Sequence, residues 1–307
     1  MLKSMQGTVE GRLVSIGLLF VGIVACRGAN DSPSGSSAAN SVPPTEDYIG
    51  ARKRFRSHLV KHQPPPDTAK PLRAPPDVRE VVFESEGLSL TAWMSGGAAD
   101  AADSPHPAVL YLHGGFGFDL SDWAAAETFR DAGFVVMAPI LRGENGQSGT
   151  FSAFYHEVDD VLAAADVLAR QPGVDPTHLY VVGHSVGGTL TMFAALGSTR
   201  FRAAASFSGA PDHQKWMKGR LDIAPYDPWD DEEFRIRSPL AFATSFKCPI
   251  RLYWGTEEPF FTDETRETAR RAKAAGLDVE AIQVEGDHIS MFGPASAQAI
   301  AFFRQQR

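Results

Sequence analysis

The sequence predicts an α/β protein with a mostly parallel central sheet and helices on both of its faces. From Asp77 onward, short apolar runs alternate with segments whose apolar residues recur at helical spacing. Such alternation is typical of βαβ units, in which helices cover a parallel sheet. The length of 307 residues, with 43% apolar and 21% charged residues, is enough for one large domain of this class.

The first half of the predicted domain contains a hairpin, two strands and a helix. Val78–Ser85 and Leu88–Ser95 are expected to pair as a β-hairpin. A loop of small residues, Ala98–Pro107, separates this hairpin from an apolar and buried strand at Ala108–Leu112. The next elements are a helix at Asp122–Ala132, which should end at Gly133, and a strand at Phe134–Ala138.

The second half continues the alternation of helices and strands. The helix Val158–Ala169 has apolar residues on one face, at Val158, Val161, Leu162, Ala165 and Leu168. In such sheets, functional groups collect in the loops at the carboxyl ends of the strands. The remaining strands are expected at Leu179–Val182, Ala203–Phe207, Ile250–Trp254 and Val279–Val284, and the remaining helices at Thr265–Ala275 and Ala295–Gln305.

The first 25 residues resemble a lipoprotein signal peptide. Lys3 and Arg12 precede an apolar stretch, Leu13–Ala25, which is short for a membrane span and suits a signal sequence. The stretch ends in Ile23-Val24-Ala25-Cys26, which resembles the bacterial lipobox, where cleavage precedes a cysteine that becomes lipidated. We therefore expect export to the bacterial cell envelope and a lipid anchor at Cys26; an ordinary signal peptide or an uncleaved anchor is the alternative.

Residues 26–76 are expected to link this anchor to a folded domain at 77–307. Gly28–Thr45 is rich in Ser, Asn, Ala, Gly and Pro, a composition typical of a flexible tether. Tyr48–Gln63 has helical spacing and many basic residues, so it is expected either to pack on the domain or to touch anionic lipid. Pro64–Pro76 contains six prolines and should be an extended connector.

Charge and cysteine content exclude several classes of partner and cofactor. The net charge of −8 leaves no basic surplus for binding nucleic acid, and the body of the chain has no run of 18 apolar residues. With Cys26 lipidated, Cys248 remains as the single cysteine, which excludes an internal disulfide and a thiolate metal site. The sequence also lacks the G-x-G-x-x-G and Gly-Lys-Ser patterns, so no metal, nucleotide or organic cofactor is expected.

Ser185 is the candidate nucleophile. The apolar run Leu179–Val182 leads directly into Gly183-His184-Ser185-Val186-Gly187, and small and apolar residues at helical spacing follow. A strand that turns sharply into a helix holds the serine exposed at the corner, while the flanking glycines relieve the crowding. An exposed serine at such a corner is suited to attack a carbonyl carbon.

A serine nucleophile needs a base, and His288 is the best candidate among nine histidines. It follows the strand Val279–Val284 and precedes the last helix, so it should lie at the carboxyl edge of the sheet. His184 adjoins Ser185, but its side chain is expected to point away at the corner.

The base needs a carboxylate that orients its imidazole, and the loop after Ile250–Trp254 supplies two. Position alone does not decide between Glu257 and Glu258, and Asp263 is a poorer third candidate. For the oxyanion, the His113-Gly114-Gly115 turn after a strand provides backbone N–H groups. The natural donors are Val186 together with Gly115 or Phe116.

Taken together, these stretches resemble the α/β-hydrolase fold. More narrowly, they resemble the catalytic domain of the prolyl oligopeptidase (S9-type) family and the related dienelactone-hydrolase-like enzymes, over residues 78–307. The resemblance rests on His113-Gly114-Gly115, Leu141-Arg142-Gly143-Glu144-Asn145-Gly146, Glu157-Val158-Asp159-Asp160, Val174-Asp175-Pro176, Gly183–Gly188, Ser238-Pro239-Leu240 and Cys248-Pro249-Ile250.

The resemblance implies that Glu258 is the acid of the triad. The family pattern is Gly-x-x-Asp, and Glu258 lies three residues after Gly255, so this chain has a glutamate where the family has an aspartate. A second departure is that the residues between Cys26 and the domain are too few for the β-propeller that oligopeptidases of this family carry. The family's peptide specificity therefore does not transfer, and small esters become as suitable as peptides.

The stretch from Pro211 to Phe246 is long for a connector and rich in aromatic residues. These residues are expected either to line the mouth of a substrate pocket or to pack inward as a local helical insertion. Its acidic residues, Asp227 and Asp230–Glu233, are expected to form a solvated face.

The sequence as a whole predicts an exported serine hydrolase that cleaves ester or amide bonds through an acyl-enzyme, with Ser185, His288 and Glu258 as its triad. A carboxylesterase or an acyltransferase acting on small substrates is the alternative within this mechanism. A non-catalytic surface binding protein on the same fold is the alternative outside it.

Overall fold

The computed structural model describes residues 46–66, 70–95 and 105–306 of the chain. The predicted signal peptide, the candidate lipidation residue Cys26 and the tether Gly28–Thr45 lie outside these residues and stay predictions. No helix within the described ranges is long and apolar enough to cross a membrane.

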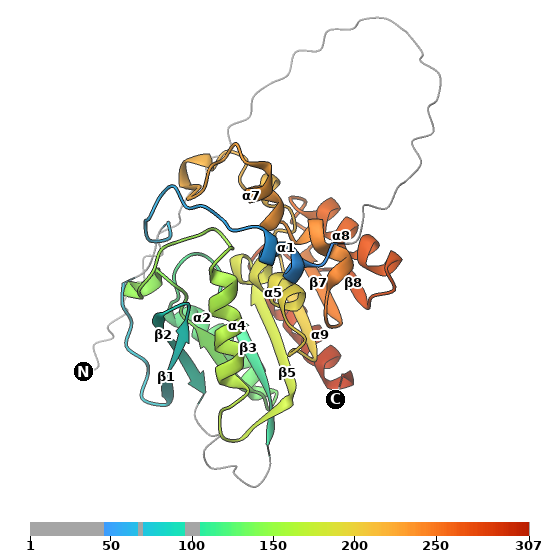
Figure 1. Cartoon of the computed structure of the whole chain (residues 1–307). Coiled ribbons are helices and arrows are strands. Elements are labelled where there is room, and N and C mark those ends of the chain that lie inside the picture. Colours follow the sequence, from blue (N-terminus) through green and yellow to red (C-terminus); the bar gives the residue numbers. More distant parts are fainter. Residues whose placement is uncertain (1–45, 67–69, 96–104, 307) are drawn as a thin grey trace, which may run out of the picture. The chain divides into compact units, whose positions relative to one another are not determined.

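The described residues form an eight-stranded sheet in the order β1-β2-β4-β3-β5-β6-β7-β8 (Figure 1). β1 and β2 are antiparallel, β2 and β4 are antiparallel, and the pairs from β4 to β8 are all parallel. This confirms the predicted fold class. The strands are β1 Val78–Ser85, β2 Leu88–Ser95, β3 His106–Leu112, β4 Val135–Pro139, β5 Val174–His184, β6 Ala203–Phe207, β7 Ile250–Gly255 and β8 Val279–Val284.

Helices cover both faces of this sheet, with α4 and α5 prominent on one face (Figure 1). The α-helices are α1 Tyr48–Arg54, α2 Leu120–Ala125, α3 Glu127–Asp131, α4 Glu157–Leu168, α5 Val186–Gly197, α6 His213–Trp216, α7 Asp231–Ile236, α8 Thr262–Ala274 and α9 Phe292–Gln305. Three short 3₁₀ helices are η1 Glu144–Gly146, η2 Leu221–Ile223 and η3 Pro239–Ser245.

The side chains of the central strand β3 alternate between two hydrophobic clusters. Leu110 and Leu112 belong to the cluster that contains buried residues of α1, α4, α5 and α8. Val109 and Tyr111 belong to the cluster that contains buried residues of α2, α3 and α9. Because successive side chains of a strand point to opposite faces, one apolar run in the sequence supplies both cores.

Two predicted elements differ most from the structure in the body of the domain. The helix expected at Asp122–Ala132 is divided into α2 and α3 at Ala126. The strand expected at Leu179–Val182 begins earlier, at Val174, because the pairing of β3 with β5 resumes after an irregularity.

The helix predicted within Tyr48–Gln63 ends at Arg54, where Phe55 takes an extended conformation. The chain beyond it pairs with the segment between β6 and β7: Leu59 forms a β-bridge to Tyr226, and Val60 N–H donates to Pro225 O at 2.7 Å. Residues 46–66 and 70–76, called the N-terminal segment below, pack on the domain.

The segment between β6 and β7 is a helical insertion that packs most of its aromatic residues inward. Trp216, Tyr226 and Phe234 are buried, while Trp229 is 85% exposed. Of its acidic residues, Glu233 is buried in an ion pair with Arg237, which corrects the prediction of a wholly solvated face. Trp216 lies 6.0 Å from Phe116, measured between ring centroids, so the insertion reaches the loop after β3.

Candidate active site

Ser185 lies at the corner between β5 and α5, in a strained backbone conformation. Its φ of 57° and ψ of −115° are unfavourable for a residue with a Cβ. The Ser185 N–H donates to Phe207 O at 2.8 Å, which ties the corner to β6. A Cβ on Gly187 would lie 2.1 Å from Leu112 O, so only glycine lets the corner approach β3 this closely.

Glu258 and His288 are hydrogen-bonded between Glu258 Oε1 and His288 Nδ1. The other carboxylate oxygen of Glu258 accepts from Ser208 Oγ at 2.5 Å and from Gly255 N–H at 2.9 Å. Burial alone would raise the pKa of Glu258, but the hydrogen bonds from His288, Ser208 and Gly255 outweigh it and hold that pKa below its usual value. Glu258 is therefore an anion held in a fixed orientation next to the imidazole.

The other two carboxylates considered from the sequence do not take this place. The side chains of Glu257 and Asp263 are exposed, and among the described residues no hydrogen bond or ion pair joins either of them to His288. The backbone explains why Glu257 points outward: its N–H donates to Gly286 O at 3.0 Å, in the loop before His288. The loops after β7 and β8 also approach closely at Gly255, where a Cβ would lie 2.2 Å from Gly286 O.

His184 links the serine corner to the His288 loop. Its Nε2 donates to His288 O at 2.6 Å, and the two imidazole centroids lie 4.7 Å apart. The expectation that this side chain points away from the site is therefore wrong. Burial, together with repulsion from His288, lowers the pKa of His184 to about 4, so its ring is neutral at pH 7.

Within the described part of the chain, no hydrogen bond joins Ser185 Oγ to His288. Such contacts are often long in structures without substrate and tighten when substrate binds. The hydrogen bond from His184 nevertheless attaches the backbone of His288 to the residue before Ser185. The side chain of His288 is 45% exposed, which leaves its ring accessible to a substrate.

The turn after β3 lies against Ser185. A Cβ on Gly114 would lie 3.6 Å from Ser185 Cβ, so the turn and the nucleophile are in direct proximity. Gly115 has a φ of 68°, a conformation that favours glycine. The N–H groups of Gly115 and Phe116 have no acceptor among the residues that the structure describes, which leaves them available to an oxyanion.

A buried pair that the sequence reasoning did not assign supports this turn. His113 Nε2 donates to Glu144 Oε2 at 2.9 Å, and Glu144 Oε2 also accepts from Leu141 N–H at 3.1 Å. Burial by itself would lower the pKa of His113, but the Glu144 charge and hydrogen bond outweigh it and raise that pKa to about 9. The stretch Leu141–Gly146, singled out only as a family motif, thus fixes the turn through an ion pair.

Asn145 anchors the same turn a few residues further on. Its Oδ1 accepts from Phe118 N–H at 2.9 Å, and its Nδ2 donates to Phe118 O at 2.8 Å and to Lys70 O at 3.0 Å. The loop after β4 therefore holds both the turn after β3 and the N-terminal segment.

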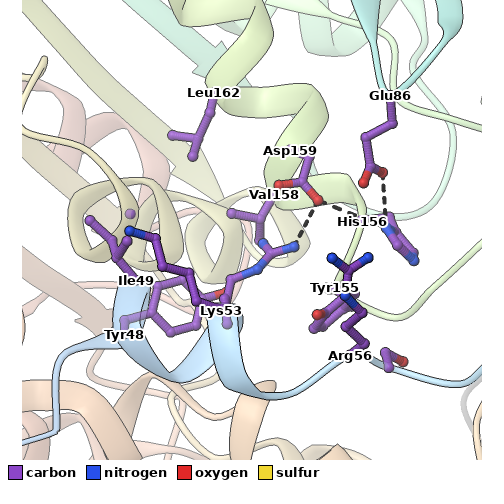
Figure 2. A pocket seen from close by; sticks show the side chains of 13 residues that line it. Tyr48, Ile49, Lys53, Arg56, Glu86, Tyr155, His156, Val158, Asp159 and Leu162 are labelled. Atoms are coloured by element: carbon purple, nitrogen blue, oxygen red, sulfur yellow. Dashed lines mark hydrogen bonds and ion pairs between the residues drawn. The ribbon is translucent and has the colours of Figure 1, made fainter.

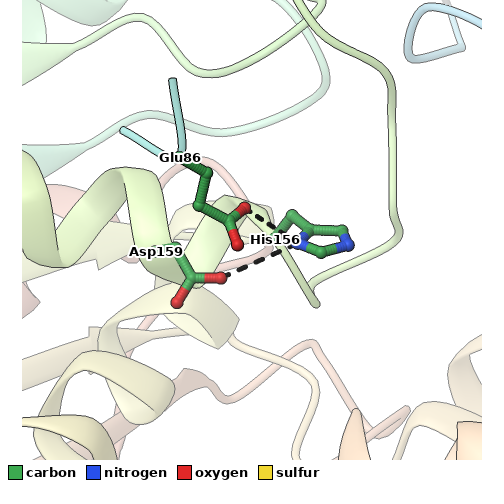
Figure 3. A group of neighbouring side chains, drawn as sticks. All are labelled: Glu86, His156 and Asp159. Atoms are coloured by element: carbon green, nitrogen blue, oxygen red, sulfur yellow. Dashed lines mark hydrogen bonds and ion pairs between the residues drawn. The ribbon is translucent and has the colours of Figure 1, made fainter. Parts of the chain in front are cut away.

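A second group of titratable residues lies away from this edge, in a pocket of about 520 Å³ between α1 and α4 (Figure 2). Glu86, His156 and Asp159 point toward one another there, and their ligand atoms lie within 4.8 Å (Figure 3). Both carboxylates are already ion-paired, Glu86 with Arg142 at 2.9 Å and Asp159 with Arg52 at 2.7 Å. Two guanidinium groups beside the same oxygens disfavour a divalent cation, so we assign these residues to an ion-pair network that joins α1, α4 and the hairpin β1–β2.

Comparisons with known proteins find a matching family and similar solved structures. The model of the prolyl oligopeptidase family matches residues 120–287, which is more than half of the chain. The chain is 25% identical over 199 residues to the uncharacterized peptidase YuxL of Bacillus subtilis (strain 168), covering 58% of this chain but 30% of that relative. The chain thus spans about a third of the length of this relative.

Two groups of solved structures share the fold. The acylaminoacyl peptidase of Pyrococcus horikoshii is 20% identical with a TM-score of 0.60, over 74% of this chain and 40% of that chain. The Pyrococcus furiosus esterase Pf2001 is 18% identical with a TM-score of 0.63, over 80% of this chain and 98% of that chain. With the family match over most of the sheet, these likenesses lead to one conclusion: the chain belongs to the prolyl oligopeptidase family and has the α/β-hydrolase fold.

Proposed function

We propose that this protein hydrolyses a carboxylic ester or amide through an acyl-enzyme, with Ser185 as nucleophile, His288 as base and Glu258 as the orienting acid. The single observation that carries the proposal is the hydrogen bond between Glu258 and His288 Nδ1. It leaves Nε2 as the nitrogen that can take a proton, and an adjacent carboxylate stabilises the imidazolium that results.

In the first half of the reaction, Ser185 Oγ attacks the substrate carbonyl carbon and its proton passes to His288 Nε2. The negative charge develops on the carbonyl oxygen, where the N–H groups of Val186 and of Gly115 or Phe116 receive it. As the bond to the leaving group breaks, the leaving group takes the proton from His288. The acyl group remains on Ser185.

In the second half, water attacks the acyl-enzyme and gives its proton to His288. The tetrahedral intermediate then releases the carboxylic acid, and Ser185 Oγ recovers its proton from His288. His184 contributes by position, because it holds the backbone of His288 while staying uncharged at pH 7. The residues described require no cofactor for any of these steps.

Covalent labelling with a fluorophosphonate tests this function directly. We expect the full-length protein to be labelled, Ser185→Ala to be unlabelled, and Ser198→Ala to be labelled like the wild type. Ser198 is a suitable control because it ends α5 at the opposite end of the helix from Ser185. A folded wild-type protein that fails to label would support the non-catalytic binding protein on the same fold.

We also propose export and lipid attachment at Cys26, a proposal that rests on the sequence of residues 1–26 alone. Metabolic labelling with a radioactive fatty acid in a bacterial host tests it. We expect incorporation into the wild-type protein and none into Cys26→Ser, whereas equal incorporation into both would contradict the proposal.

A further inference from the structure

A very small cavity lies beside the residues that are proposed to bind the oxyanion. Its volume is about 10 Å³, and the side chains of Phe116 and Val186 form part of its lining. The rest of its lining consists of apolar residues, Pro65, Leu141, Phe151, Phe154 and Leu190, and of the charged residues Arg142, Glu144 and Glu157. A cavity of this volume has room for about one water-sized group, which is close to the size of a methyl group.

One wall of the cavity comes from the N-terminal segment rather than from the sheet and its helices. Pro65 lines the cavity and is buried. The neighbouring Gln63 O accepts a hydrogen bond from Phe151 N–H at 2.9 Å, which fixes the segment to another wall of the same cavity. On the outer side, a Cβ on Gly143 would lie 3.0 Å from Pro65 Cδ, so this proline is also held against the loop after β4.

The aromatic side chains around the cavity support one another. Phe116 lies 5.2 Å from Phe151 and 6.0 Å from Trp216, and Phe154 lies 5.2 Å from Trp216, all measured between ring centroids. These pairs are edge-to-face contacts, a favourable geometry for aromatic rings. Each of these rings therefore packs against a neighbouring ring, which restrains its rotation.

The topology of the sheet indicates which part of a substrate faces this cavity. Ser185 follows β5, in the middle of the order β4-β3-β5-β6-β7-β8. His288 follows β8 on one side of it, and the leaving group must face His288 to take its proton. The lining residues of the cavity come from the N-terminal segment, the loops after β3 and β4, α4 and α5, none of which lies beyond Leu190 in the chain. An acyl substituent on Ser185 that faces away from His288 would lie on the side of this cavity.

We propose that this cavity is the acyl-binding site, that it accepts an acetyl group in preference to longer chains, and that Pro65 of the N-terminal segment sets this limit. The inference rests on the proposed function, since it requires the acyl-enzyme at Ser185. An acetyl ester acylates Ser185, and its alcohol leaves with the proton from His288. Water then hydrolyses acetyl-Ser185 and releases acetate. The substrate class is thus a small acetylated alcohol or amine.

The test is the acyl-chain preference of the full-length protein toward p-nitrophenyl acetate, butyrate and octanoate. We expect the wild type to prefer acetate over butyrate by at least about tenfold in kcat/KM, because each methylene that does not fit a closed pocket is costly. Pro65→Ala removes two ring carbons from the wall and should raise the butyrate-to-acetate ratio by about tenfold.

Pro71→Ala is the matched control. It makes the same substitution in the same connector, but Pro71 does not line the cavity. Pro71 packs against Gly146 instead: a Cβ on Gly146 would lie 2.9 Å from Pro71 Cγ. The control should keep the wild-type ratio. Circular dichroism of both variants checks that they are folded. The acyl-chain preference of the wild type tests the acetyl-sized site without any variant.

The outcomes separate this inference from the proposed function. If the wild type reacts with a fluorophosphonate but hydrolyses the three esters equally well, the acetyl-sized site is wrong and the serine hydrolase mechanism stands. If the wild type prefers acetate and Pro65→Ala keeps that preference, the role of Pro65 is wrong. If no ester is hydrolysed and no probe reacts, the function at Ser185 fails, and the acyl site fails with it.

Discussion

Ser208 donates its hydroxyl to Glu258 Oε2 at 2.5 Å, on the side of the carboxylate that is turned away from His288. Ser208 itself directly follows β6 and has a φ of 49°. The glutamate is therefore held from two strands, through Ser208 after β6 and through Gly255 N–H at the end of β7. The hydrogen bonds from Ser208 and Gly255 explain how a glutamate, one methylene longer than the family's aspartate, keeps a fixed orientation here.

Substitution of Glu258 tests the assignment of the acid. We expect Glu258→Gln to lower kcat about 10³- to 10⁴-fold, because the amide no longer stabilises the imidazolium. Glu258→Asp should lower kcat about 10²-fold, since the shorter chain cannot reach His288 and Ser208 together. Glu257→Gln is the matched control and should be neutral, as its side chain is exposed. A large loss in Glu257→Gln with none in Glu258→Gln would reverse the assignment.

Substitution of His184 tests its role as a positioning residue. We expect His184→Ala to lower kcat by about tenfold or more, because the His288 loop loses the donor at its backbone carbonyl. His184→Gln places an amide N–H near the position of the lost Nε2 and should restore most of the activity. Equal losses in both variants would show that the imidazole acts by packing rather than by its hydrogen bond.

The sequence predicts the strands better than the segments whose conformation depends on distant contacts. The bounds of β1, β2, β6 and β8 agree with the predicted ones, because their apolar runs end at clear turns. Residues 55–63 carry a helical pattern yet form no helix, and Leu59 instead pairs with Tyr226, more than 160 residues away. Nothing local in the sequence encodes that bridge.

In the candidate site, too, residues with a local sequence pattern can be predicted and residues that act through distant contacts cannot. Ser185 and His288 can be proposed from the sequence because each follows a strand in a recognisable order, whereas the choice of Glu258 over Glu257 also needs the resemblance to the family. Ser208 and the His113–Glu144 pair were not assigned, since a lone serine after a strand and a separation of 31 residues carry no pattern of their own. Their roles follow only from contacts in the folded chain.

The His113–Glu144 pair should make stability depend on pH. The pKa of His113 is about 9 in the folded protein, above the ordinary value of 6.5, because Glu144 stabilises the imidazolium. The folded state therefore binds this proton more tightly, so the stabilisation is complete below pH 6.5 and is lost as the pH rises through 9. Between pH 6.5 and 9, the loss of the proton from His113 should lower the free energy of unfolding by up to about 3 kcal/mol.

Glu144→Gln isolates this contribution in urea denaturation at pH 6.5 and at pH 9.5. Without the carboxylate, burial disfavours the imidazolium, so the variant should be less stable at pH 6.5 and should change less between the two pH values. Glu80→Gln makes the same chemical change at an exposed position of β1 and should follow the wild type at both. A wild-type and a Glu144→Gln curve that run parallel would contradict the raised pKa.

The buried ion pair of Arg237 with Glu233 lies where the insertion meets the N-terminal segment: Glu233 accepts from Ser57 Oγ at 2.8 Å and from His58 N–H at 2.8 Å. Arg237 also donates to Ser152 O at 3.0 Å and to Ser57 Oγ at 2.6 Å, and it lies 4.1 Å from the centroid of the Tyr226 ring. Both charged side chains are almost completely buried, so removal of one leaves the other without its partner.

We expect Arg237→Met to lower the free energy of unfolding by about 3–5 kcal/mol in urea denaturation, and Glu233→Leu to cost a similar amount. The double variant should cost less than the sum, because neither charge is then left buried alone. Arg235→Met serves as the control, since Arg235 is only partly buried and pairs with Glu46 and Glu232 near the surface; its cost should stay near about 1 kcal/mol. Strictly additive costs for Arg237 and Glu233 would mean that each side chain stabilises the fold through its own contacts and that the ion pair contributes nothing beyond them.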